Sequence, residues 1–202
     1  MVRQELEGSR GAAETQVARP RWVFEHTVEG LFRMALGTRL SAAAQQSLCA
    51  AGLDLSRRLL PAYSQDTWKR CLAIAAEDVY PRVPRPEAWR RLGSELILGV
   101  SQTVMGRAMV SVARMLGPLR WLRRVQHTLR GLDNVVEVRL TELSPTACQL
   151  HLNDVMEQPS FYQGVLEALL TQAGARQARA RVIQREGAGA TLHVEWEEQH
   201  GR

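Results

Sequence analysis

The residue types that most often hold metals are few and scattered in this chain. The three cysteines, Cys49, Cys71 and Cys148, form no CxxC pair, and the five histidines form no HxH or HxxxH pair. A metal site needs three or four such ligands at close spacing, so the sequence predicts none. We expect the cysteines to be reduced and mostly buried thiols in a cytosolic protein.

Signatures of nucleophilic and nucleotide chemistry are also absent from the sequence, which has no GxSxG, P-loop or GxGxxG. Cys148 has no cationic neighbour in the sequence to lower its pKa, which favours a packed thiol over a nucleophile. His151 and His193 each fall on a predicted strand and would approach each other if both faced one side of a sheet. Two ligands leave a metal site incomplete, so we interpret both as structural. We therefore expect no enzymatic activity.

A basic run is the most distinctive local feature. From Leu96 to Leu132 the chain has six arginines and no acidic residue. We expect Arg120, Arg123 and Arg124 to face away from the apolar stripe of their helix, where they could meet an acidic partner, a nucleotide or a nucleic acid. Only one tryptophan, Trp121, interleaves with these arginines. A solvated helix face is therefore favoured over nucleic-acid binding.

Methionines supply a second candidate site. Met105, Met109 and Met115, together with Trp121 and Trp68, are candidates to line a pocket, because thioethers fill irregular space. The pocket would lie between a long helix and a sheet and would hold an apolar or amphipathic small molecule. Ordinary core packing without a ligand is the alternative for these residues.

The 202 residues fit one domain with a tail. Residues 1–20 are expected to be a disordered tail. Residues 21–202 would form a single α+β domain, helical over 21–131 and a sheet with one helix over 132–198. No apolar run approaches the roughly 20 residues that span a bilayer, and the N-terminus lacks the apolar segment of a secretory signal. We therefore expect a cytoplasmic protein without a membrane span.

Apolar residues recur at a spacing of three or four through the first part of the chain, which predicts helices. Structure should begin near Trp22, with Ser41 and Ser64 as N-caps of two helices and Gly93 as a break before the longest one. The predicted helices cover residues 23–36, 42–51, 67–80, 87–92, 94–116 and 119–130.

The long helix over 94–116 is the central element of this prediction. We expect it to cover one face of the sheet, and we expect Gly99 and Gly106 within it to permit close helix packing. Its apolar residues should form one buried stripe, made of Ile97, Val100, Val104, Ala108, Val112 and Met115.

The period changes from 3.6 to 2 after residue 132, which predicts strands. An amphipathic helix over 161–173 interrupts them, so the order is β-β-α-β-β, a unit that packs a helix on an antiparallel sheet. The fold class is therefore α+β, an N-terminal helical bundle followed by this sheet. The predicted strands cover 136–141, 148–153, 178–186 and 190–198.

Four short motifs resemble a large uncharacterised paralogous family of myxobacteria. They are Glu29-Gly30-Leu31-Phe32, then Leu60-Pro61-Ala62-Tyr63 with Trp68, then Gly106-Arg107-Ala108, and then Leu116-Gly117-Pro118. The resemblance covers roughly Val23 to Glu198. It implies no assigned chemistry.

The order of elements also resembles the haem–nitric-oxide-binding fold and its relatives, the vinyl-4-reductase-type and transport-particle-like domains. That resemblance implies a small molecule between the helical half and the sheet half. In the haem-binding members a histidine on the helix before the sheet ligates iron, and His127 is on such a helix. Those members hold the haem propionates with a Tyr-x-Ser-x-Arg motif, but the comparable strand, Cys148 to Asp154, has no Tyr, Ser or Arg. Without such donors the haem carboxylates would be buried uncompensated.

We therefore expect a non-enzymatic sensory or regulatory module that binds a small molecule in an apolar pocket between the long helix and the sheet. The first alternative is a protein-interaction module without a ligand, possible as a homodimer. The second is a haem-based gas sensor that uses His127. No cofactor is expected under the first two hypotheses.

Overall fold

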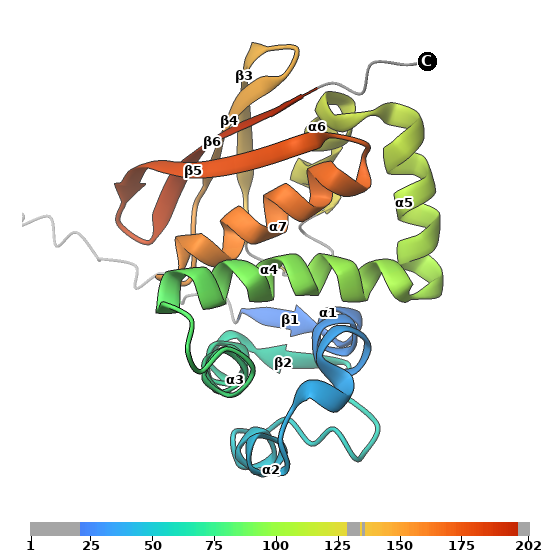
Figure 1. Cartoon of the computed structure of the whole chain (residues 1–202), viewed down its shortest axis with the longest axis vertical. Helices are drawn as coiled ribbons and strands as arrows, with labels where there is room; N and C mark the ends of the chain where they lie inside the picture. The colour runs from blue at the N-terminus through green and yellow to red at the C-terminus, as the bar shows by residue number, and fades with distance from the viewer. Residues whose placement is uncertain (1–20, 129–133, 135, 198–202) are drawn as a thin grey trace, which may run out of the picture.

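The computed structural model describes residues 21–128, 134 and 136–197, without the side chains of residues 125–128. The predicted tail at 1–20 lies outside the described residues. Figure 1 shows the elements in tiers: a four-stranded sheet, helix α7 (Pro159–Gln172), helix α4 (Arg85–Gln102), and the N-terminal helices below α4. Helices with an antiparallel sheet confirm the predicted α+β class.

The N-terminal part contains a small sheet that the sequence did not reveal. β1 (Trp22–Phe24) pairs antiparallel with β2 (Ala62–Ser64), so the predicted helix start at Val23 is wrong. Strands of three residues are too short to show a period of two, which explains the error. The helical segments of this part are α1 (Glu25–Glu29), a π-helical continuation η1 (Gly30–Leu36), a 3-10 turn η2 (Gly37–Arg39), α2 (Ala42–Ala50) and α3 (Gln65–Val79).

The two predicted N-caps are confirmed. The hydroxyl oxygen of Ser41 accepts a hydrogen bond from the backbone N–H of Ala44 at 3.1 Å. That of Ser64 accepts one from the N–H of Thr67 at 3.1 Å. Each cap satisfies one of the N–H groups that the first turn of a helix leaves without a partner.

The long helix predicted over 94–116 is wrong as one rod, because the chain bends by 103° between α4 and α5 (Val104–Leu116). Thr103 at the bend has an extended backbone, and its hydroxyl oxygen accepts from Gly106 N at 3.0 Å. The same hydroxyl donates to the carbonyl of Val100 at 2.8 Å. Thr103 thus caps a second helix at the point where the first one ends. Within the described residues no single helix is long and apolar enough to cross a bilayer; only this bent pair meets the length and composition criteria together.

The predicted break at Gly93 is also wrong, because α4 runs through it. Gly93 lies where α4 crosses α7: a Cβ atom on Gly93 would overlap the carbonyl oxygen of Phe161, and one on Gly164 would overlap that of Arg90. Gly99 meets the backbone of η1 in the same way, which confirms its predicted role in close packing. The helix backbones therefore touch at both crossings, an approach that only glycine allows.

The sheet confirms the predicted β-β-α-β-β unit. Its strand order is β3-β4-β6-β5, and all neighbouring strands are antiparallel. Cys148 pairs with Val194 and Leu150 with Leu192, and all four side chains are buried. The strands are β3 (Val138–Ser144), β4 (Ala147–Leu152), β5 (Arg176–Glu186) and β6 (Gly189–Glu197).

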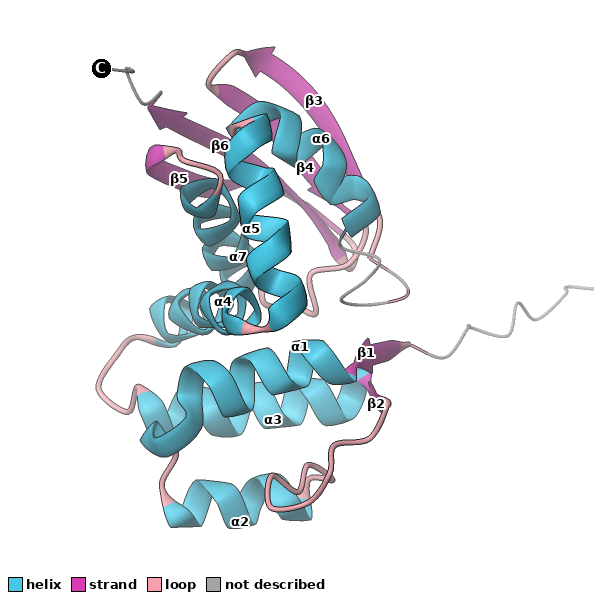
Figure 2. Cartoon of the chain, turned by 90° about the vertical axis from the view of Figure 1, so that its right-hand side faces the viewer, coloured by secondary structure: helices cyan, strands magenta, loops and turns pink. Residues whose placement is uncertain are grey.

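The prediction that the 94–116 rod roofs this sheet is wrong. The buried face of the sheet is packed by α7 and by α6 (Pro118–Thr128). The bend at Thr103 directs α5 upward along the edge of the molecule, where its main contacts are with α4, α6 and α7 (Figures 1 and 2). The predicted pocket between a long helix and the sheet therefore has no rod to form its roof.

An aromatic cluster joins the helical half to the sheet half. Phe161 of α7 makes edge-to-face contacts with Trp68, Trp89 and Tyr162, with ring centroids 6.5, 6.4 and 5.6 Å apart. All four side chains are buried in one continuous apolar core. Such contacts add to the stabilisation that comes from burying the rings.

The thiols provide a first testable prediction. Cys71 and Cys148 are buried, whereas Cys49 is exposed. Burial raises the pKa of Cys71 to about 11 and that of Cys148 to about 12, from an ordinary value of 9.0. At about pH 8 we expect a thiol-specific reagent to label Cys49 in the folded protein and the other two only after denaturation. Rapid labelling of a folded Cys49→Ser variant would contradict this.

As a further part of this first prediction, the same pKa values imply a loss of stability in alkali. Both buried thiols stay protonated in the folded protein up to a higher pH than in the unfolded chain. Below pH 9.0 the thiols are protonated in both states and do not lower the free energy of unfolding. Above pH 9.0 they ionise first in the unfolded chain, so the free energy of unfolding decreases as the pH rises toward the folded pKa values of about 11 and about 12.

Candidate functional site

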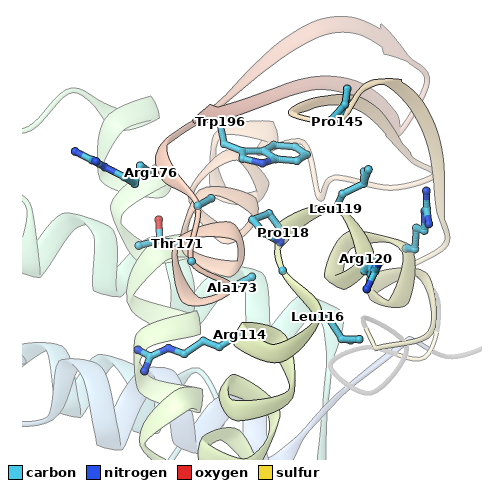
Figure 3. Close-up of a pocket in the computed structure, with 14 residues that line it drawn as sticks. Arg114, Leu116, Pro118, Leu119, Arg120, Pro145, Thr171, Ala173, Arg176 and Trp196 are labelled. Atoms are coloured by element: carbon cyan, nitrogen blue, oxygen red, sulfur yellow. The ribbon is translucent and has the colours of Figure 1, made fainter. Parts of the chain in front are cut away.

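A cavity of about 950 Å³ opens where the α5–α6 corner and the C-terminal end of α7 meet the sheet (Figure 3). Its wall combines arginines with apolar side chains. The arginines are Arg114, Arg120, Arg123 and Arg176, and the larger apolar residues are Leu116, Pro118, Leu119, Pro145 and Trp196.

The four arginines come from three elements. Arg114 is in the last turn of α5, Arg120 and Arg123 are in α6, and Arg176 begins β5 after α7 has ended. In Figure 3 Arg114 and Arg176 extend to one side of the opening and Arg120 to the other. Among the side chains that the structure describes, none forms a hydrogen bond or ion pair with Arg114, Arg120 or Arg176.

Arg123 differs from the other three because it is already paired. Its guanidinium donates to both carboxylate oxygens of Glu142 on β3, at 2.6 and 2.8 Å. These hydrogen bonds raise the pKa of Arg123 and lower that of Glu142. The pair ties α6 to β3, so among the described residues the guanidinium groups of Arg114, Arg120 and Arg176 are the ones left for a ligand.

Trp196 is the largest apolar side chain among the residues that line the cavity. Its side chain is 6% exposed, and its backbone N–H donates to the carbonyl of Thr146 at 3.0 Å, which anchors the end of β6. The indole ring lies next to Pro118 and points toward Leu119 (Figure 3). A flat apolar surface thus adjoins the arginines.

The corner between α5 and α6 depends on Gly117. Its φ of 76° lies in the left-handed region that glycine adopts without strain. Pro118 then begins α6, as is usual for proline at the first helical position. This Gly-Pro corner places Arg114 and Arg120 at the same cavity although they belong to different helices.

The five residues predicted to line an apolar pocket do not line this cavity. Met105 and Met115 are 70% and 85% exposed, which contradicts a position facing an enclosed pocket, and Met109 is half-buried. Trp68 and Trp121 are core residues of different parts of the fold. The stripe on α5 was expected to be buried, but the bend turns its apolar side outward.

The indole N–H of Trp121 is buried without a hydrogen-bond partner among the described residues.

The three arginines of the predicted basic patch, Arg120, Arg123 and Arg124 of α6, are exposed, as expected, and the first two line the cavity. His127 is on α6, but its side chain lies outside the described part of the structure. Sequence reasoning missed Arg114, Arg176 and Trp196 as members of the same site. Gly117 and Gly174, glycines of the kind that end helices, are local signals near Arg114 and Arg176.

The two strand histidines lie on the outer face of the sheet. His151 contacts the hydroxyl of Thr191 at 3.2 Å, and His193 Nε2 lies 3.6 Å from a carboxylate oxygen of Glu195. Each has a local polar partner, consistent with a structural role. Within the described residues no group of three or more His, Cys, Asp or Glu side chains could hold a metal ion.

The fold is that of H-NOX domains. An oxygen-binding H-NOX domain related to soluble guanylate cyclases, in its oxygen complex, is 14% identical with a TM-score of 0.59, and the match covers 88% of this chain and 94% of that chain. An Fe(II) unliganded H-NOX mutant from K. algicida is 9% identical, with a TM-score of 0.61 and coverage of 87% and 97%. An H-NOX mutant of T. Tengcongensis is 15% identical, with a TM-score of 0.55 and coverage of 87% and 96%. Identities this low establish the fold alone.

The chain belongs to the family described as "Protein of unknown function (DUF2378)", whose model matches residues 21–197. The expected membership of an uncharacterised family is thus confirmed. No curated protein sequence matches the chain.

Proposed function

We propose that this protein is a non-enzymatic regulatory module that binds an anionic small molecule with an apolar part in the basic cavity. The observation that carries the proposal is the convergence of Arg114, Arg120 and Arg176 beside Trp196 around about 950 Å³. Ligand sites of this kind usually enclose about 300 to 1,000 Å³. The H-NOX-like fold supports the sensory part of the proposal, because H-NOX domains are solved with a bound gas molecule.

The chemistry of the wall favours binding over catalysis. Guanidinium groups present paired N–H donors that match carboxylate and phosphate oxygens. Trp196, Pro118 and Leu119 offer a complementary apolar surface. Of the lining residues that the structure describes, none is a carboxylate, histidine or cysteine that would act as a nucleophile or general base.

The second prediction tests this site with 8-anilinonaphthalene-1-sulfonate, an aromatic anion whose fluorescence reports binding. We expect saturable binding that inorganic phosphate weakens. Arg120→Glu and Arg176→Glu should each reduce the affinity at least about tenfold, because one charge-assisted hydrogen bond contributes about 1.5 to 3 kcal/mol. Arg82→Glu makes the same charge change at an exposed arginine outside the cavity and should leave the affinity within about twofold of the original. Equal losses in all three variants would refute the site.

The H-NOX fold suggests haem as a cofactor. The described residues do not provide the charges that the haem propionates would need. The strand comparable to the propionate-binding motif, Cys148 to Asp154, has no arginine or lysine, and its Asp154 is buried and already paired with Arg21. Asp154 also accepts a hydrogen bond from Met156 N at 2.6 Å. A further carboxylate there would meet a like charge in a buried place. We therefore propose that the protein binds no haem; a Soret band on adding haem, abolished by His127→Ala, would overturn this.

A further inference from the structure

The outward side of α5 carries several exposed apolar side chains, including the three most exposed large ones among the described residues. Val104 is 80% exposed, Met105 70%, Val112 41% and Met115 85%. Val104, Ala108, Val112 and Met115 are spaced three or four apart and fall on one side of the helix, and Met105 lies at the edge of that side. The side that packs on the protein is different and carries the small residues Gly106 and Ala113. The apolar ridge, defined as Val104, Met105, Ala108, Val112 and Met115, is therefore a feature of the surface.

Positive charge flanks the apolar ridge. Arg107 and Arg114 are exposed on a third side of α5, and Arg120 follows on α6. The sequence has no acidic residue between Glu95 and Asp133. The nearest acidic residue on the adjoining strand, Glu142, is paired with Arg123. An apolar side flanked by arginines is typical of helices that lie in the interface of an anionic membrane.

We propose that α5 docks on a membrane surface that carries anionic lipid headgroups, with the apolar ridge inserted among them and the arginines at headgroup level. Charge complementarity favours this occupant, since each arginine near an anionic surface adds to binding. Helix α5 stands at the edge of the molecule (Figures 1 and 2), and the exposed fractions of the ridge residues place them on its outward side. A convex ridge suits a deformable lipid surface better than a rigid protein groove.

A second copy of the chain is a poorer occupant. The helix has 13 residues and is roughly 20 Å long, so the ridge alone is smaller than the surface that a stable protein interface needs. A stable protein interface buries about 800 Å² on each partner. Two copies would also bring their own arginines together. A helix of this length is shorter than the roughly 30 Å hydrocarbon core, so it would lie on the membrane rather than cross it.

The third prediction is tested by co-flotation of the full chain with vesicles of phosphatidylcholine, with or without about one third phosphatidylserine. We expect at least about tenfold stronger association with the anionic vesicles, and weakening by salt. A Met105→Glu/Met115→Glu double variant should lose at least about tenfold of it. Arg107→Glu should lose about fivefold or more. A Leu143→Glu/Ile183→Glu double variant, at two apolar side chains that are each 51% exposed outside α5, should bind as the original does.

Three outcomes overturn the proposal: equal association with neutral and anionic vesicles, undiminished association of the Met105→Glu/Met115→Glu variant, or a dimer in sedimentation that this variant abolishes. The third outcome would assign the ridge to a second copy. Met105, Met115 and Arg107 do not line the basic cavity, so binding of 8-anilinonaphthalene-1-sulfonate should persist in all these variants. Failure of vesicle binding is therefore distinguishable from failure of the cavity proposal.

Discussion

Replacing Gly164 with alanine is expected to lower the free energy of unfolding by about 3 kcal/mol, at the upper end of the usual cost of overpacking. The new Cβ atom would overlap the carbonyl oxygen of Arg90 on α4. A backbone oxygen cannot rotate away as a side chain can, so α7 and α4 must separate. Gly93→Ala meets the carbonyl of Phe161 on the same crossing and should have a similar effect. Urea unfolding followed by circular dichroism measures both.

The expected loss of stability in Gly164→Ala is opposite in sign to the effect of helix propensity. A glycine-to-alanine change inside a helix normally stabilises by about 0.5 to 1 kcal/mol. Gln46→Ala, at an exposed position of α2, serves as the control and should change stability by less than about 0.5 kcal/mol. If Gly164→Ala were neutral or stabilising, the backbone contact between α4 and α7 would be wrong.

Truncating Phe161 to alanine should cost about 4 kcal/mol. The ring is buried and contacts Trp68, Trp89 and Tyr162, so its removal leaves a cavity at the point where the two halves of the fold meet. The same urea titration measures the loss. Phe24→Ala is the matched control, because that ring is half-buried and stacks only on His26 among the described aromatic side chains. A loss at Phe161 no larger than that at Phe24 would contradict the assigned core.

Local sequence patterns predicted the helix caps and strands correctly where the tertiary packing agrees with the local preference. The strands showed a period of two because one face of the sheet is buried, and Cys148, Leu150 and Leu152 are on that face. Ser41 and Ser64 were recognisable as caps because the interaction lies within four residues. In these segments the local preference and the tertiary fold agree.

The two wrong predictions about helix bounds have different causes. At the bend, Thr103 carries a local N-cap signal toward Gly106, but the apolar pattern continues across it and favoured one helix. Gly93 resembles a helix break, whereas its role is to admit α7, which follows about 70 residues later. That role cannot be deduced without knowing which helices meet.

The candidate site was predictable only in part for the same reason. Arg120 and Arg123 stood out as exposed because they alternate with buried Trp121 and Leu122 on one helix. Arg176 and Trp196 reach the same cavity from strands far along the chain. Periodicity also does not distinguish an apolar stripe that packs on the core from one that is exposed on the surface. For this reason Met105 and Met115 were placed wrongly.

The touching backbones of α4 and α7 limit how this protein can respond to a bound molecule. Interlocked glycines resist sliding, because any axial shift drives a carbonyl group against a neighbouring main chain. The crossing therefore serves as a fixed frame. Displacement on binding should be concentrated in α5 and α6, which follow the bend at Thr103 and the corner at Gly117 and can pivot there.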